Sequence, residues 1–139
     1  MITAIDTNIL IDIFGADPTY GGRSKDALRS SIQEGSIIAC EVVWAEVISL
    51  FPTGSMAQEA LEGIGIGYSP LEADASMTAG QLWKIYRDKG GKRTRMVADF
   101  LIGAHALHQA DVLLTRDRGF FRLGIPSLTI VDPSRQKNS

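Results

Sequence analysis

The sequence is poor in cysteine and has no long hydrophobic run, and each absence excludes a class of protein. Its one cysteine among 139 residues is Cys40, which rules out an intrachain disulfide and a zinc site built from several cysteines. The longest uncharged stretch, Val47 to Gln58, has 12 residues and includes Pro52 and Gly54, whereas a membrane-spanning helix needs about 20 apolar residues. The first residues, MITAIDTNILID, contain no basic cluster, so we expect no signal peptide and a cytoplasmic protein without membrane contact.

A strong excess of one charge is also missing. The chain carries 16 acidic and 14 basic residues, for a net charge of −2, while nucleic-acid-binding domains are usually basic overall. Neither a GxxxxGKS/T nor a GxGxxG pattern occurs, so no phosphate-binding loop is expected.

The length suits one domain, which we place at residues 1–132, followed by a polar tail at 133–139.

Short apolar runs alternate with longer helical patterns along the chain. The apolar runs predict strands over Ile2–Ile5, Ser36–Cys40, Gly65–Tyr68, Val112–Thr115 and Ser127–Val131. The periodic segments predict helices over Asn8–Phe14, Ser24–Gln33, Glu41–Phe51, Ser55–Gly63, Leu71–Arg87 and Val97–Gln109. Continuous apolar strands separated by helices are typical of a parallel sheet covered on both faces. We therefore predict an α/β fold, a three-layer α/β/α sandwich with a short, mostly parallel sheet of four or five strands.

Four acidic residues stand in apolar surroundings. Asp6 and Asp117 follow apolar strands, whereas Glu46 and Asp99 lie within apolar helical segments. Burying a carboxylate is costly unless another group compensates its charge, and Mg²⁺ or Mn²⁺ prefers oxygen ligands. Functional residues gather beyond the carboxyl ends of parallel strands, so the four acids would form a metal site if they converge there, which periodicity alone does not show. Taken singly, each also fits a plainer role, as a helix N-cap, a solvated helix position or a surface turn.

Three segments of the chain resemble the motifs of PIN-domain ribonucleases, and most of all those of the VapC toxins of bacterial toxin–antitoxin pairs. The opening AIDTNILID is similar to the first motif, and AEVISL resembles the glutamate motif. The stretch ADFLIGAHALHQADVLLTRDRGFF is similar to the last two motifs in their usual order. The resemblance covers residues 2 to 132 and implies the same PIN-like sandwich.

The resemblance also implies an activity and a set of site residues. It implies catalytic, metal-binding roles for Asp6, Glu46, Asp99 and Asp117, and supporting roles for Thr7, Asn8 and Thr115, with Mg²⁺ or Mn²⁺ as the cofactor. The implied substrate is RNA, and the implied partner is a small antitoxin. Apolar residues between Glu41 and Gly63 exceed what one buried helix face needs, so they predict a core contribution together with a homodimer or antitoxin interface.

Other acids and both histidines fit plainer roles. Asp111 precedes a strand, which puts it at the opposite end of the sheet, and Asp12 lies on a helix at the margin of the site. Glu41 is about 140° from Glu46 around a helix and suits the helix start, where an acid complements the dipole. For the histidines, His105 and His108, packing or surface roles are more plausible than a zinc site.

Basic residues are concentrated in one part of the chain. Nine bases and four acids lie between Lys84 and Arg122, for a local net charge of +5, and the remainder carries −7. Because Lys and Arg contact phosphates, this distribution favours a polyanionic substrate, although a solvated charged loop is the alternative. We predict RNA contacts from Lys92, Arg93, Arg95, Arg116 and Arg118.

The interpretation leaves two other functions open. One is a stand-alone RNA-processing nuclease with no antitoxin, and the other is a non-catalytic module that keeps the fold and binds RNA or protein. A phosphatase of the dehalogenase type would need a second Asp two residues after the first, where this chain has Asn8. For the nuclease we expect products with 5′-phosphate and 3′-hydroxyl ends, because no histidine pair is placed for 2′-hydroxyl chemistry.

Overall fold

A five-stranded sheet forms the centre of the protein. The computed structural model describes residues 1–91, 97–117, 119, 125 and 127–135. The strands are β1 (Ile2–Ile5), β2 (Ser36–Ala39), β3 (Ile66–Tyr68), β4 (Val112–Leu114) and β5 (Ile130–Val131). Their spatial order is β3-β2-β1-β4-β5, and every neighbouring pair is parallel. The carboxyl ends of all five strands therefore meet at one edge of the sheet.

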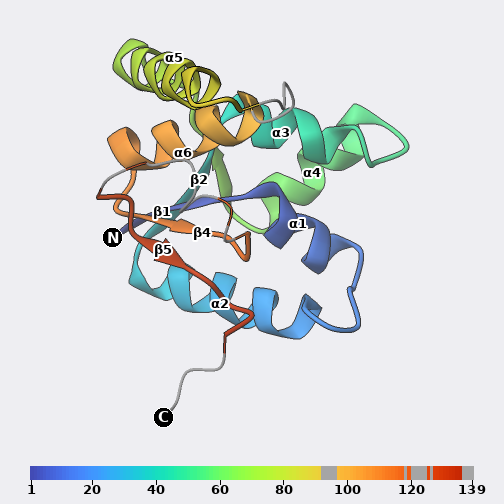
Figure 1. Ribbon diagram of the computed structural model, residues 1–139. Coiled ribbons are helices and arrows are strands. Elements are labelled where there is room, and N and C mark those ends of the chain that lie inside the picture. Colours follow the sequence, from blue (N-terminus) through green and yellow to red (C-terminus); the bar gives the residue numbers. More distant parts are fainter. Residues whose placement is uncertain (92–96, 118, 120–124, 126, 136–139) are drawn as a thin grey trace.

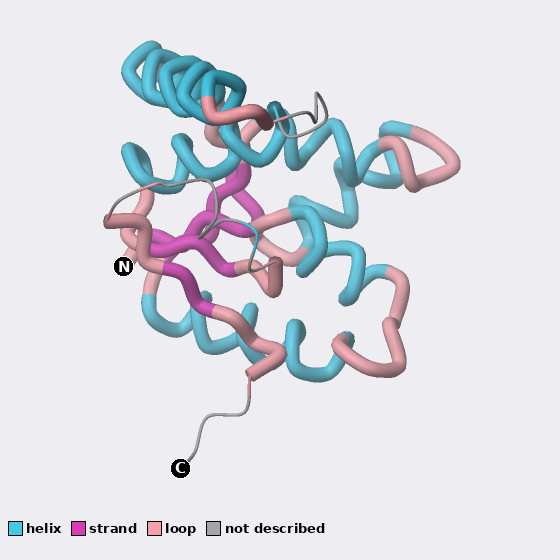
Figure 2. The backbone as a smooth tube through the Cα atoms, viewed as in Figure 1, coloured by secondary structure: helices cyan, strands magenta, loops and turns pink. Residues whose placement is uncertain are grey.

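Within the described residues, six helices cover this sheet. They are α1 (Thr7–Phe14), α2 (Gly21–Glu34), α3 (Glu41–Ile48), α4 (Gly54–Gly63), α5 (Ala73–Asp88) and α6 (Val97–Gln109). Figure 1 shows α2 along one side of the sheet, with α6 on the other side and α5 packed outside α6. Figure 2 shows the strands enclosed between these helical layers. The predicted three-layer α/β/α sandwich is confirmed, and the sheet is wholly parallel.

The central strands form the core. Ile5 and Leu114 are register partners in β1 and β4, and both are completely buried. Phe100 of α6 is also buried, and its ring meets Tyr86 of α5 edge-on at 5.6 Å between centroids. Continuous apolar strands of this kind suit a sheet with helices on both faces. None of the helices within the described ranges is long and apolar enough to span a bilayer.

Several predicted boundaries differ from the structure by one to three residues, and two of these differences have a local cause. The helix predicted over Glu41–Phe51 stops at Ile48, where Ser49 forms its C-cap and donates a 2.6 Å hydrogen bond from Oγ to the Glu46 carbonyl. The strand predicted over Ser127–Val131 is confined to Ile130–Val131. Ser127 has a φ of 66°, a left-handed conformation that no β-strand accommodates, so the strand begins after it.

Candidate active site

Asp6 lies between the end of β1 and the start of α1. Its backbone is extended (φ −84°, ψ 157°), and its Oδ1 accepts a 2.7 Å hydrogen bond from the Thr7 amide, which caps the helix. Its Oδ2 accepts a 2.7 Å hydrogen bond from the Thr115 hydroxyl. The side chain is buried, with 6% of the residue exposed. A strand-to-helix junction thus holds this carboxylate in one orientation at the carboxyl edge of the sheet.

The electrostatic environment links Asp6 to two further acids. The pKa of Asp6 is raised to about 6, mainly by burial and also by the charges of Asp99 and Asp117, while the Thr115 and Thr7 hydrogen bonds lower it. Asp99 comes from the first turn of α6, and Asp117 follows β4. Charges act on a carboxyl in this way only from close by. Three of the four predicted acids therefore share one neighbourhood.

Glu46 approaches the same neighbourhood from α3. Its Oε1 accepts a 3.0 Å hydrogen bond from the Thr7 hydroxyl, although the two residues are 39 positions apart. Thr7 therefore touches two of the predicted acids, because its amide is bonded to Asp6. Glu46 itself is exposed, so its carboxylate lies at the open side of the site.

Thr115 is the centre of a small hydrogen-bond network. While its hydroxyl donates to Asp6, the same oxygen accepts from Asn8 Nδ2 at 3.3 Å and from the Asp117 amide at 3.0 Å. One donor and two acceptor positions are all that a hydroxyl offers, so its capacity is fully used. Thr7, Asn8 and Thr115 are thus all found in contact with the predicted acids or with each other, as supporting roles require.

Asp12 is the residue whose contacts sequence reasoning did not foresee. It was expected at the margin of the site, yet it is 1% exposed and forms an ion pair with Arg116, accepting from Nε at 2.8 Å and from Nη2 at 2.9 Å. The Ser24 hydroxyl donates to its Oδ2 at 2.9 Å. Its position four residues after Asn8 places both side chains on one helix face, but no sequence pattern marks Arg116 as its partner.

The remaining acids and histidines lie elsewhere. Asp111 accepts a hydrogen bond from the Ile2 amide at the start of β1, the end of the sheet opposite Asp6. Glu41 accepts from the Leu71 amide at 3.0 Å. His105 pairs with the Ser69 hydroxyl at 3.0 Å, and burial lowers the pKa of this histidine. His108 pairs with the Thr78 hydroxyl at 2.7 Å.

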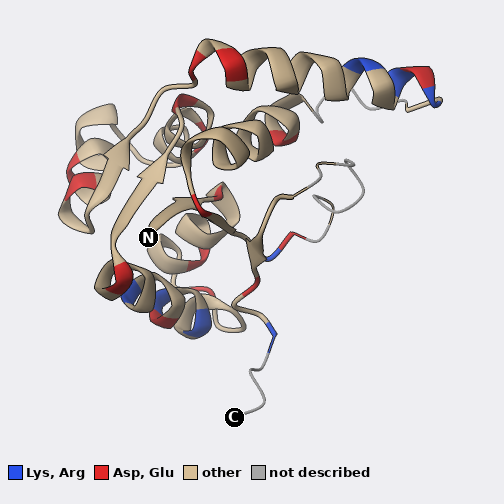
Figure 3. Cartoon of the chain, turned by 90° about the vertical axis from the view of Figure 1, so that its left-hand side faces the viewer, with Lys and Arg blue, Asp and Glu red and all other residues tan. Residues whose placement is uncertain are grey.

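The predicted RNA-binding residues are described only in part. Lys92, Arg93, Arg95 and Arg118 lie outside the described residues. Arg116 stands beside the acidic site, but two of its N–H groups already bond to Asp12, and its guanidinium carbon is 4.3 Å from the Tyr20 ring centroid. Figure 3 shows other basic residues, coloured blue on the cartoon, at the end of α5 and along α2. The RNA-binding roles stay predictions.

The donor set fits a hard divalent cation. All four predicted ligands offer carboxylate oxygens, which Mg²⁺ and Mn²⁺ prefer. The pKa of Asp6 is raised first by burial and then by the charges of Asp99 and Asp117, and a bound cation would compensate both effects. In the part of the chain that the structure describes, no three Asp, Glu, His or Cys side chains already stand in a ready-made cage.

Comparison with known proteins assigns the sequence to one family. Residues 3–126 match the sequence profile of the PIN domain. This match includes all four predicted ligands and the three supporting residues. No curated protein matches the sequence.

Solved structures share the fold over nearly the whole chain. VapBC-1 from nontypeable Haemophilus influenzae has a TM-score of 0.73 at 19% identity, covering 97% of this chain and 100% of that one. A toxin–antitoxin complex from Klebsiella pneumoniae has a TM-score of 0.68 at 25% identity, covering 94% and 97%. VapC20 from Mycobacterium tuberculosis, described as a toxin that cleaves the sarcin–ricin loop, has a TM-score of 0.64 at 16% identity, covering 91% and 98%. At these sequence identities, the structural similarity supports the assignment of the fold.

Proposed function

The chain belongs to the PIN-domain family, and we propose that it is a Mg²⁺- or Mn²⁺-dependent endoribonuclease that acts as the toxin of a toxin–antitoxin pair. The observation that carries this proposal is the convergence on Asp6. Burial raises the pKa of this carboxyl, and the charges of two acids from distant parts of the chain, Asp99 and Asp117, add to the rise. A buried group that is shifted by specific charged neighbours in this way is a candidate functional site.

Each supporting residue has a definite task in this proposal. Thr115 holds Asp6 Oδ2 in place, and Thr7 ties the Glu46 carboxylate to the start of α1. Such contacts orient ligands and reduce the freedom lost on binding. A bound Mg²⁺ or Mn²⁺ would supply Lewis-acid polarisation of the phosphodiester and activation of water. The protein's part is to hold the carboxylates that would bind the ion beside the reacting phosphate.

The proposed products have 5′-phosphate and 3′-hydroxyl ends. Cyclisation through the 2′-hydroxyl uses an acid and a base, which in proteins are most often histidines. Both histidines of the chain pair with hydroxyls away from the acids, His105 with Ser69 and His108 with Thr78. Hydrolysis at the carboxylate site therefore accounts for cleavage without a cyclic intermediate.

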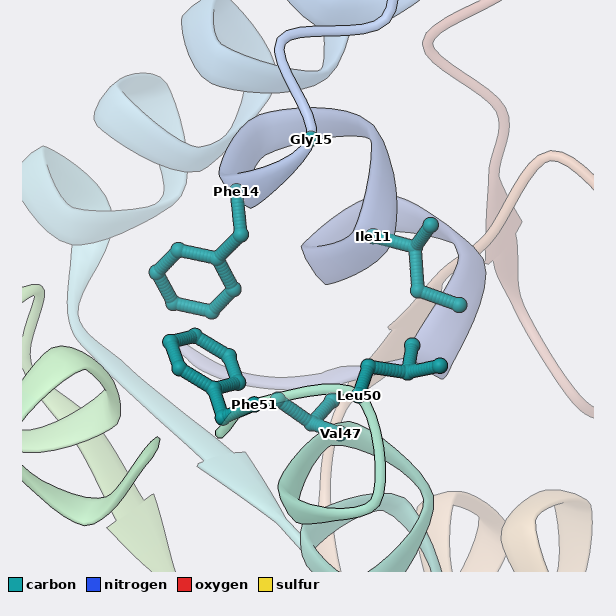
Figure 4. A pocket seen from close by; sticks show the side chains of 6 residues that line it. All are labelled: Ile11, Phe14, Gly15, Val47, Leu50 and Phe51. Atoms are coloured by element: carbon teal, nitrogen blue, oxygen red, sulfur yellow. The ribbon is translucent and has the colours of Figure 1, made fainter. Parts of the chain in front are cut away.

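The toxin role is supported by the nature of the similar structures. Several of them are toxin–antitoxin complexes, among them the proteins from Haemophilus influenzae and Klebsiella pneumoniae. An apolar hollow of about 220 Å³ between α1 and the end of α3 offers a surface for such a partner. It is lined by Ile11, Phe14, Gly15, Val47, Leu50 and Phe51 (Figure 4). Leu50 is 62% exposed, so a partner or a second copy of the chain would bury it.

Expression in bacterial cells and analysis of RNA ends test the proposal together. Expressing the wild-type chain should arrest growth, and co-expression of the small protein encoded beside it should relieve the arrest. Asp99→Asn should be harmless to the cells, whereas Asp111→Asn, altered at the opposite end of the sheet, should remain toxic. Sequencing of the cleaved RNA should find 5′-phosphates. Cyclic 2′,3′-phosphate ends, or equal toxicity of the two variants, would contradict the proposal, and cleavage without toxicity would favour an RNA-processing nuclease.

A further inference from the structure

The segment from Thr115 to Asp117 is held by one face of α1. Asn8 contacts it twice, through Nδ2 to the Thr115 hydroxyl and through Oδ1, which accepts from the Arg116 amide at 3.5 Å. One turn further along α1, Asp12 accepts two hydrogen bonds from the Arg116 guanidinium. Residues four apart on a helix lie on the same face, so Asn8 and Asp12 form hydrogen bonds to adjacent parts of the same segment.

The contact between Asp12 and Arg116 is partly buried and is supported by neighbouring residues. Asp12 is 1% exposed, whereas the Arg116 side chain is 30% exposed. Ser24 of α2 donates to the same Asp12 oxygen that accepts from Arg116 Nε, and the Tyr20 ring lies against the guanidinium. A bidentate carboxylate–guanidinium pair fixes direction as well as distance. The cluster thereby joins α1, α2 and the chain that leaves β4.

Arg116 stands between two residues of the acidic site. Thr115 precedes it and bonds to Asp6, and Asp117 follows it and is one of the four predicted ligands. A shift of the Arg116 backbone would therefore move both neighbours relative to Asp6. Outer contacts of this kind orient the ligands of a metal ion.

We propose that Asp12 is a positioning residue that, by holding Arg116, sets the Asp117 carboxylate relative to Asp6. The proposal rests on the proposed function, since it concerns the same metal site. It gives Arg116 a structural task in addition to the RNA contact predicted from its charge. Asp12 acts only through Arg116 and touches none of the four predicted ligands in the described contacts.

The test compares Asp12→Asn with the wild-type chain. An amide at this position offers one acceptor and turns an NH₂ group toward the guanidinium, so the bidentate pair is lost. Mn²⁺ binding, measured by isothermal titration calorimetry, should weaken by about 10–100-fold. With a short RNA substrate, kcat should fall by a similar factor while KM changes by less than about twofold. The matched control is Asp26→Asn, which alters an exposed carboxylate on α2 and should change none of these values.

A second variant separates positioning from stability. Asp12→Leu combined with Arg116→Met replaces both charges, so no unpaired charge is left buried, and such replacements often preserve or raise stability. The double variant should melt near the wild-type temperature and still bind Mn²⁺ about 10–100-fold more weakly. Wild-type Mn²⁺ affinity in either variant would overturn the proposal, and so would a rise in KM alone for Asp12→Asn. A wild-type chain that neither binds Mn²⁺ nor cleaves RNA would overturn the proposed function, independently of any substitution.

Discussion

The Thr115 hydroxyl donates a 2.7 Å hydrogen bond to Asp6 Oδ2, although the two residues are 109 positions apart in the chain. The pairing of β1 with β4 brings them together, because Ile5 and Leu114 are register partners and each is followed directly by one of the two residues. The Asp6 amide continues this ladder with a 3.0 Å bond to the Leu114 carbonyl. The register of the central strands thus determines the geometry of the site.

Thr115→Val should weaken metal binding without unfolding the protein. Valine has nearly the shape of threonine, but it cannot donate to Asp6 or accept from Asn8 and the Asp117 amide. We expect Mn²⁺ affinity to fall by about 10–100-fold, as is typical when an outer contact of a ligand is lost. Calorimetric titration measures the change. Thr129→Val, altered at an exposed position before β5, serves as the control, and equal affinities for the two variants would show that the Thr115 hydroxyl has no such role.

Substitutions of the two glutamates on α3 should have different effects. Glu46→Gln keeps an acceptor for the Thr7 hydroxyl but removes a charge from the site, so Mn²⁺ affinity should fall by at least about tenfold. Glu41→Gln removes a charge from the same helix at a residue that bonds to the Leu71 amide, and it should leave the affinity unchanged. If Glu41→Gln had the larger effect, the assignment of Glu46 would be wrong.

His105 should make stability depend on pH. Burial holds the pKa of His105 below its usual value near 6.5, so the unfolded chain takes up a proton at a higher pH than the folded one. The contribution of His105 to the free energy of unfolding is therefore fully present above about pH 6.5 and is lost as the pH falls below that value. Chemical denaturation at pH 7.5 and pH 5.5 should show a loss of unfolding free energy that is smaller in His105→Gln. His108→Gln, altered at an exposed position of the same helix, should keep the wild-type loss, and identical pH profiles for all three proteins would contradict the prediction.

Divalent metal should stabilise the folded chain. A ligand present at a hundredfold excess over its Kd contributes about 2.7 kcal/mol to the free energy of unfolding, so Mn²⁺ should raise the melting temperature by several degrees. In Asp6→Asn this rise should disappear. The pKa of Asp6 is raised to about 6, mainly by burial. Above that pH the ionised carboxylate therefore lowers the free energy of unfolding when no cation is bound. In EDTA at pH 8, Asp6→Asn should therefore melt no lower than the wild type, and a large drop would contradict this account.

Much of the site was predictable because its residues lie directly at the ends of strands or the starts of helices. Asp6 follows an apolar strand and caps a helix, and Thr115 and Asp117 follow another apolar strand, so a parallel sheet brings them to one edge. The convergence of Glu46 was less predictable from the residues themselves, because it depends on how α3 packs beside α1. Its motif resemblance indicated the residue, and the contact with Thr7 supplies the geometry.

The contacts of Asp12 were missed for a physical reason. Sequence periodicity places Asp12 on a helix but does not show which distant residue reaches that face. Its partner Arg116 lies 104 positions away and was assigned to RNA from its charge alone. The predicted start of the last strand was wrong for a similar reason. The left-handed conformation of Ser127 shortens this strand, and no local sequence pattern indicates that conformation.

The most direct test of the central claim is the cleavage of total RNA by the purified chain in Mg²⁺ or Mn²⁺, with and without EDTA, for the wild type and Asp6→Asn. The account predicts that the wild type cleaves only when free metal is present. It predicts that Asp6→Asn is folded but loses more activity than the roughly 10–100-fold that follows loss of an outer contact. Cleavage that persists in EDTA, or wild-type activity in Asp6→Asn, would contradict the assignment of this acidic site as a metal-dependent nuclease centre.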